Sequence, residues 1–186
     1  MITRVATLSM KILREILFVL VALCCFPLFS QNLNIEEKAL YDLIMEYRRA
    51  NGLAPIPLSN SLCLVAQTHV RDLYLNRPSN GNCNLHSWSN SGLWTSCCYT
   101  DDHAKAQCMW SKPRELTSYR GNGYEIACGS GGELSAETSL ALWKSSPGHN
   151  AVILNQGIWG NNNWQAIGIG LDNGFGVVWF GEDKIR

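Results

Sequence analysis

Five cysteines within residues 83–128 lie in a stretch without hydrophobic periodicity, and this feature constrains the fold more than any other. Asn, Gly, Ser and scattered Trp dominate residues 77–132, where only residues 124–127 are typical of a short strand. A long irregular segment inside a compact domain is usually functional or cross-linked. We therefore expect this segment to be held by disulfides and to carry part of a functional site.

The first 30 residues have the layout of a secretory signal peptide. Basic residues precede an apolar run at 16–29, and Ser30 supplies a small residue at the cleavage point. The run has about 14 residues, whereas a membrane span needs ~20. A lipid anchor at Cys24 is disfavoured because the preceding residue is large. We expect a signal peptide at 1–30, a single domain at 31–186, and secretion to the extracellular space or periplasm without a permanent membrane span.

Six cysteines remain after removal of the leader. An even number in an oxidising compartment predicts up to three disulfides, with the connectivity left open. A bridge between neighbouring residues strains the peptide, so Cys97 and Cys98 are each expected to pair elsewhere. Zinc knuckles of the C-x-x-C type are absent, and a paired cysteine is no nucleophile. The disulfide candidates are Cys63, Cys83, Cys97, Cys98, Cys108 and Cys128.

Capping residues mark four helix starts. Asn34 with Glu37 has the pattern of a capping box, and apolar residues recur at helical spacing up to Gly52. The second helix is expected to end before Pro78, and Pro147 suits the first position of the fourth. The expected N-caps are Asn34, Ser59, Ser135 and Ser146.

Two strands are expected near the C-terminus. Residues 164–171 and 175–182 flank Asp172-Asn173-Gly174, a strong hairpin signal. Helices come first and strands last, without βαβ alternation, so the fold class is α+β. Lys plus Arg and Asp plus Glu number 15 each, which argues against nucleic acid as a partner.

Four stretches carry a family resemblance. They are LYDLIMEYRRANGLAPIPLS from Leu40, HSW from His86, GYEIA from Gly123 and LWKSSPGHNAVIL from Leu142. Together with the final hairpin they resemble the CAP superfamily, which groups cysteine-rich secretory proteins, antigen 5 and pathogenesis-related proteins of class 1. The SPGHNAVIL segment is the most specific, being similar to SPGHRANIL of bacterial members. The resemblance implies a three-layer α-β-α sandwich with a small antiparallel sheet, here stapled by disulfides.

In this family a cleft is lined by two His and two Glu. Carried over position by position, the resemblance implies that His86, Glu125 and His149 line the cleft. The second Glu of many eukaryotic members falls on Ser146. This chain therefore departs from the tetrad, as many bacterial members do, and a mechanism that needs all four groups is in doubt.

Two His and one Glu form the ligand composition of a catalytic zinc site. His149 is expected near a helix N-terminus, whose dipole favours the neutral imidazole that binds a metal or accepts a proton. The alternative is a structural hydrogen-bonded network, because the spacing matches no motif such as H-E-x-x-H. The sequence requires no cofactor, and zinc or another divalent cation is the candidate.

The remaining histidines have structural interpretations. His69 lies on the apolar stripe of the second helix and is expected to be a hydrogen-bonded core residue rather than a ligand. His103 follows Asp101 and Asp102 and is expected in a solvated turn with a His–Asp contact, a surface cation site being the alternative.

Seven Trp suggest an exposed aromatic platform for a glycan or lipid. Trp143 and Trp179 fall in expected helices and strands, so we place them in the core. The surface candidates, in irregular stretches, are Trp88, Trp94, Trp110 and Trp159.

Two functions follow from these observations. The first is a secreted, non-enzymatic CAP module that binds a small apolar ligand, such as a lipid or sterol, or a cell-surface component. The alternative is a zinc-dependent, peptidase-like hydrolase that uses His86, Glu125 and His149. The missing second Glu favours the first.

Overall fold

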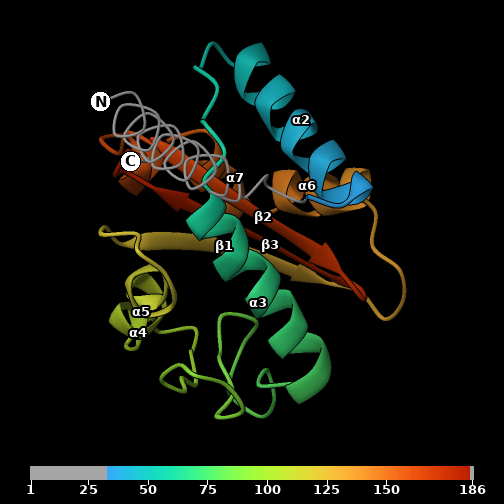
Figure 1. The fold of residues 1–186 in the computed structure, drawn as a ribbon. Coiled ribbons are helices and arrows are strands. Elements are labelled where there is room, and N and C mark those ends of the chain that lie inside the picture. The colour runs from blue at the N-terminus through green and yellow to red at the C-terminus, as the bar shows by residue number, and fades with distance from the viewer. Residues whose placement is uncertain (1–32, 185–186) are drawn as a thin grey trace, which may run out of the picture. The chain divides into compact units, whose positions relative to one another are not determined.

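A computed structural model describes residues 33–184, so the expected signal peptide lies outside the described residues. Figure 1 shows the arrangement of the helices and strands. Among residues 33–184 no helix is both long and apolar enough to cross a bilayer. In chain order the structure contains α2 (Ile35–Ala50), α3 (Asn60–Asn76), α4 (Ala106–Trp110), α5 (Lys112–Leu116), β1 (Gly123–Gly129), α6 (Ala136–Ser145), α7 (Pro147–Ile153), a 3-10 turn η1 (Gly157–Trp159), β2 (Ala166–Asp172) and β3 (Phe175–Gly181).

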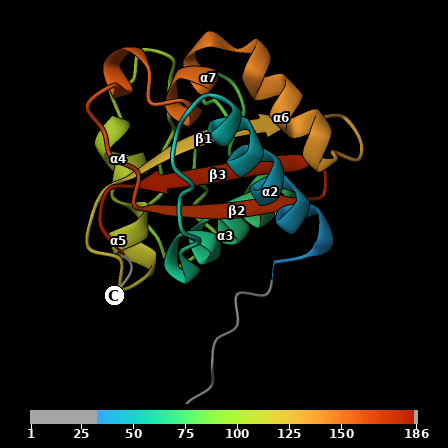
Figure 2. The ribbon, with the colours of Figure 1, turned by 90° about the horizontal axis from the view of Figure 1, so that it is seen from above.

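A three-stranded antiparallel sheet in the order β1-β3-β2 forms the middle layer of residues 33–184. Helices α2, α6 and α7 cover one face, and α3, α4 and α5 cover the other (Figures 1 and 2). This is the α+β, three-layer arrangement that the sequence predicted. Each face has its own apolar core, which is the pattern expected of a sheet buried on both sides.

Strand β2 alternates large and small residues between the two faces. Ile167 and Ile169 pack on the α2 side, whereas Gly168 and Gly170 face α3. A Cβ atom at Gly168 would lie 2.0 Å from the carbonyl carbon of Leu62. The two glycines therefore let the backbone of α3 lie directly on the sheet, which fixes the position of every side chain that α3 presents to it.

The capping predictions are confirmed. Asn34 and Glu37 form a complete capping box, and the side chains of Ser59 and Ser135 accept hydrogen bonds from the first turns of α3 and α6. Ser146 precedes Pro147 at the start of α7 without a side-chain bond. In the hairpin, Asn173 and Gly174 have φ values of 48° and 80°, as a type I′ turn requires.

The irregular stretch is more structured than expected. It contains the short helices α4 and α5, which lie among the cysteines and were not expected from the sequence because neither is long enough to show a period. Two disulfides join Cys83 to Cys98 and Cys97 to Cys108. As expected, the adjacent Cys97 and Cys98 do not pair with each other.

A third disulfide is absent from residues 33–184, which corrects the expectation for Cys63 and Cys128. Both are free and buried. Cys128 belongs to the core on the α2 and α6 face of the sheet, while Cys63 lies on α3, which covers the opposite face. Cys128 is on the edge strand β1, and Cys63 bonds to the backbone of Ile169 on the other edge strand, β2, so β3 stands between them. Burial raises the pKa of each to about 11.

Candidate functional site

Glu125 is a buried carboxylate at the centre of a polar network. Strand β1 directs its side chain to the α3 face of the sheet, where it is completely shielded from solvent. Its Oε2 lies 2.6 Å from His69 Nδ1, and its Oε1 lies 2.6 Å from His86 Nδ1. Both carboxylate oxygens are thus engaged by imidazoles.

His69 is the second buried member of the network. Its Nε2 lies 3.0 Å from the carbonyl oxygen of Ser87, which only accepts, so Nε2 carries a proton. Burial opposes ionisation of Glu125, but the charge and hydrogen bonds of His69 and His86 prevail and lower the pKa of Glu125. His69 thus links the Glu125 carboxylate to the Ser87 carbonyl and forms the buried end of the network.

Trp88 shields this pair. It is only 2% exposed, so its expected place among the surface tryptophans was wrong. Its ring stacks on His69 with centroids 4.2 Å apart and an interplanar angle of 11°. The buried Lys112 ammonium lies 5.5 Å from the Trp88 ring centroid and pairs with Glu115. Trp143 and Trp179 are in the core, as expected, and Trp94, Trp110 and Trp159 are half-buried.

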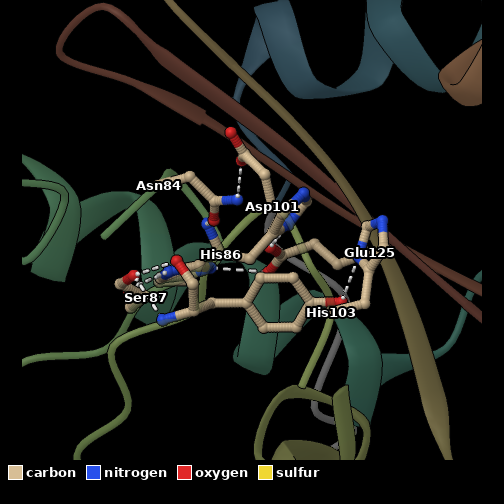
Figure 3. A network of polar contacts seen from close by, with 8 residues as sticks. Asn84, His86, Ser87, Asp101, His103 and Glu125 are labelled. Carbon is tan, nitrogen blue, oxygen red and sulfur yellow. Dashed lines mark hydrogen bonds and ion pairs between the residues drawn. The ribbon is translucent and has the colours of Figure 1, made fainter. Parts of the chain in front are cut away.

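His86 is the partly exposed member, with 17% of its side chain accessible. Nδ1 donates to Glu125, so the neutral imidazole has its lone pair on Nε2. Within residues 33–184 no hydrogen bond engages Nε2. Asn84 Oδ1 accepts from the His86 backbone N–H, and the Tyr99 ring packs edge-on at 5.2 Å (Figure 3). Glu125 therefore orients His86 with its free nitrogen away from the carboxylate.

His149 lies half-buried in the first turn of α7. Its pKa is lowered, first by burial and then by repulsion from His86, with Glu125 opposing the change. The neutral form expected from the sequence is thus favoured, but burial and His86 are the causes. Ser146 caps α7 and provides no carboxylate at the position of the second Glu.

His103 lies in an exposed turn, as expected, with a positive φ of 58°. Its Nδ1 lies 2.9 Å from the hydroxyl of Tyr99. Asp102 accepts from Thr100 and from the N–H of Ala104, and these bonds, together with the charge of His103, lower the pKa of Asp102.

The His₂Glu zinc site that the sequence suggested stays a prediction, and its carboxylate is hydrogen-bonded to His69 and His86. Glu125 directs both oxygens to imidazoles and is an orienting group, not a free ligand. Across residues 33–184 no cluster of three or more His, Cys, Asp or Glu is arranged to hold a metal ion. The donors that remain are His86 Nε2 and the imidazole of His149, two short of a closed tetrahedral zinc site.

Sequence reasoning identified His86, Glu125 and His149 but placed His69 outside the site. The signal was available, because a histidine on a buried apolar stripe must find hydrogen-bond partners. What could not be read was the identity of those partners, since His69 and Glu125 are 56 residues apart.

An open groove lies elsewhere, beside the hairpin turn and the ends of α2 and α3. Its volume is about 1420 Å³. Both apolar and polar side chains line the groove, and His86, Glu125 and His149 are not among them. The apolar lining residues are Leu33, Ile35, Leu73, Tyr74, Leu134, Leu171 and Phe175.

Comparison with known proteins identifies one family and several solved structures with a similar fold. Residues 41–158 match the model of the cysteine-rich secretory protein family, CAP. No curated protein sequence matches the chain. An outer surface protein of Borrelia burgdorferi has the same fold, with a TM-score of 0.55 and 19% identity over 80% of this chain and 93% of its own.

Two further structures are similar over 80% of this chain. An extracellular protein with an SCP domain from Bacillus anthracis has a TM-score of 0.56 and 16% identity, with 40% of its length covered. A cysteine-rich secretory protein from Staphylococcus aureus has a TM-score of 0.50 and 17% identity, with 38% covered. At these identities the likeness concerns the fold.

Proposed function

Because the chain belongs to the cysteine-rich secretory protein (CAP) family, we propose that it is a secreted binding module and not an enzyme. Its binding groups are the exposed edge of His86 and the neighbouring His149. Secretion is supported by the leader-like first 30 residues and by similar folds in an extracellular and an outer surface protein.

The occupied carboxylate of Glu125 is the observation that carries this proposal. A hydrolase needs a group to activate water and a group to stabilise developing charge. Here the only acid of the trio is committed to two imidazoles, and Ser146 stands where a second acid would be. The remaining imidazole nitrogens can accept a hydrogen bond from a ligand or bind a cation weakly.

A zinc-dependent hydrolase is the second candidate, favoured by the free Nε2 of His86 and the neutral form of His149. A bound zinc ion would polarise a carbonyl group or activate water. With two protein ligands, water has to complete the coordination.

A lipid or sterol would occupy the groove beside the hairpin and not the polar site. Its apolar walls suit an acyl chain or ring system, and the exposed Tyr74 offers an aromatic surface. A fluorescent fatty acid and a sterol, titrated against wild type and Tyr74→Ala, test this part of the proposal. Unchanged affinity in the variant contradicts the groove as the lipid site.

Zinc titration calorimetry tests the choice between module and hydrolase. The protein is compared with the His86→Ala/His149→Ala double variant and with His103→Ala, which removes an exposed histidine that touches Tyr99 and leaves the nitrogens of His86 and His149 in place. Zinc bound at one ion per chain with micromolar affinity, lost only in the double variant, supports a two-imidazole site and justifies a substrate screen. Peptide or ester hydrolysis that disappears on chelation overturns the non-enzymatic proposal.

A further inference from the structure

The Cys83–Cys98 disulfide closes the segment that carries His86. Cys83 lies three residues before His86, and Cys98 directly precedes Tyr99, whose ring packs against the His86 imidazole. The bridge therefore joins the two loop segments that hold His86 beside Glu125.

Two hydrogen bonds continue the connection past the bridge. The N–H of Asn84 donates to the carbonyl of Tyr99 at 2.8 Å, and the N–H of Tyr99 donates to Ser87 Oγ at 2.9 Å. Asn84 in turn accepts from the His86 N–H, and Ser87 accepts from His69 (Figure 3). Opening the bridge leaves His86 held by these bonds and by the Trp88–Cys97 backbone pair two residues further along, and it removes the one covalent link on the Asn84 side of His86.

The second disulfide is placed differently. Cys97 is buried and pairs through its backbone with Trp88, which stacks on the buried His69. Cys98, by contrast, is exposed and Cys83 is half-buried. Cys108, the partner of Cys97, is half-buried like Cys83, so Cys98 is the most exposed cysteine of the two bridges and the first that an external thiolate meets.

We propose that the Cys83–Cys98 disulfide is a redox switch for the binding site. One thiolate of a dithiol reductant attacks the sulfur of Cys98, an exposed residue, the S–S bond breaks, and Cys83 leaves as a thiolate that takes up a proton. The second thiol of the reductant then displaces Cys98 from the mixed disulfide. The protein's disulfide thereby gains two electrons and two protons and becomes two cysteine thiols, and the dithiol reductant is oxidised to its own disulfide.

Reduction releases His86 from Glu125 but leaves the buried His69–Glu125 pair. The site is assembled in an oxidising compartment and disassembled in a reducing one, so the chain acquires its binding groups only after export. This consequence rests on the proposed function, whereas the structural switch does not.

Imidazole NMR of the ¹⁵N-labelled protein tests the switch without any ligand. In the oxidised protein we expect the Nδ1–H tautomer of His86. In Cys83→Ser/Cys98→Ser we expect loss of that tautomer signal, and in the matched Cys97→Ser/Cys108→Ser variant we expect it to persist. Near-ultraviolet circular dichroism of the buried Trp residues establishes that each variant is folded.

Stepwise reduction of the wild-type protein keeps the test valid if a variant does not fold. Dithiothreitol is added in increments, peptide mapping identifies which bridge is open, and NMR follows His86 in the same samples. Loss of the Nδ1–H signal in step with opening of Cys83–Cys98 supports the switch. An unchanged His86 signal after that bridge opens, or equal loss in both double variants, overturns it even when ligand binding proves real.

Discussion

His69 Nδ1 lies 2.6 Å from Glu125 Oε2, and both side chains are completely shielded from solvent. The pair joins α3 to the edge strand β1 through a polar contact that is shielded from water. Removing one member leaves a buried polar atom of the other without its partner. The same pair fixes the tautomer of His86, so stability and site geometry have a common origin.

The two histidines bound to Glu125 should differ in their contribution to stability. We expect His69→Ala to lower the free energy of unfolding by about 3 kcal/mol, because it leaves the buried Oε2 of Glu125 without a partner while His86 still holds Oε1. His86→Ala should cost about 1–2 kcal/mol, since solvent reaches the vacated space. Urea unfolding followed by Trp fluorescence measures both. Equal costs would show that the two imidazoles have equivalent roles.

The lowered pKa of His149 makes stability depend on pH. Its pKa lies below the ordinary value of 6.5, so the unfolded chain binds a proton at a higher pH than the folded one. The stabilisation is therefore present above pH 6.5 and is lost as pH falls toward the lowered pKa. Urea titrations across this window should show a smaller pH slope for His149→Asn than for wild type. An identical slope would refute the assignment.

Gly168 should tolerate no side chain. In Gly168→Ala the new Cβ would lie 2.0 Å from the backbone of Leu62, and backbone cannot move aside as a flexible side chain can. We expect a loss of about 3 kcal/mol or more in unfolding free energy. The control is Gly131→Ala, where the added Cβ has no neighbour within 4 Å and the change should stay within about 0.5 kcal/mol. Thermal melts of the pair suffice for the comparison.

Cys63 and Cys128 should be unreactive in the folded protein. Burial raises the pKa of both thiols to about 11, so neither the thiolate nor an approach path is available near neutral pH. Iodoacetamide with peptide mapping should modify neither residue in native buffer and both in urea. Modification of only one in native buffer would reveal local opening on that face of the sheet.

The local structure was largely readable from the sequence. Capping side chains bond to backbone groups within three residues, so Asn34 with Glu37, Ser59 and Ser135 could be recognised without any tertiary information. Asn173-Gly174 likewise specifies its own turn. The family resemblance then supplied the three-layer arrangement and brought His86, Glu125 and His149 together as cleft residues.

The chemical state of the site was decided by the tertiary structure. Whether Glu125 is a metal ligand or an orienting group depends on which imidazoles reach its oxygens, and His69 reaches it across 56 residues of sequence. Trp88 is buried because it stacks on His69, although its own neighbours in sequence are polar. The cysteine pairing was settled in the same way, because Cys63 lies against β2 and Cys128 lies on β1, at opposite edges of the sheet. The sequence by itself determined where helices and the hairpin turn begin, through bonds between residues close in the chain. Only packing between distant segments determined which side chains of the site are hydrogen-bonded to one another.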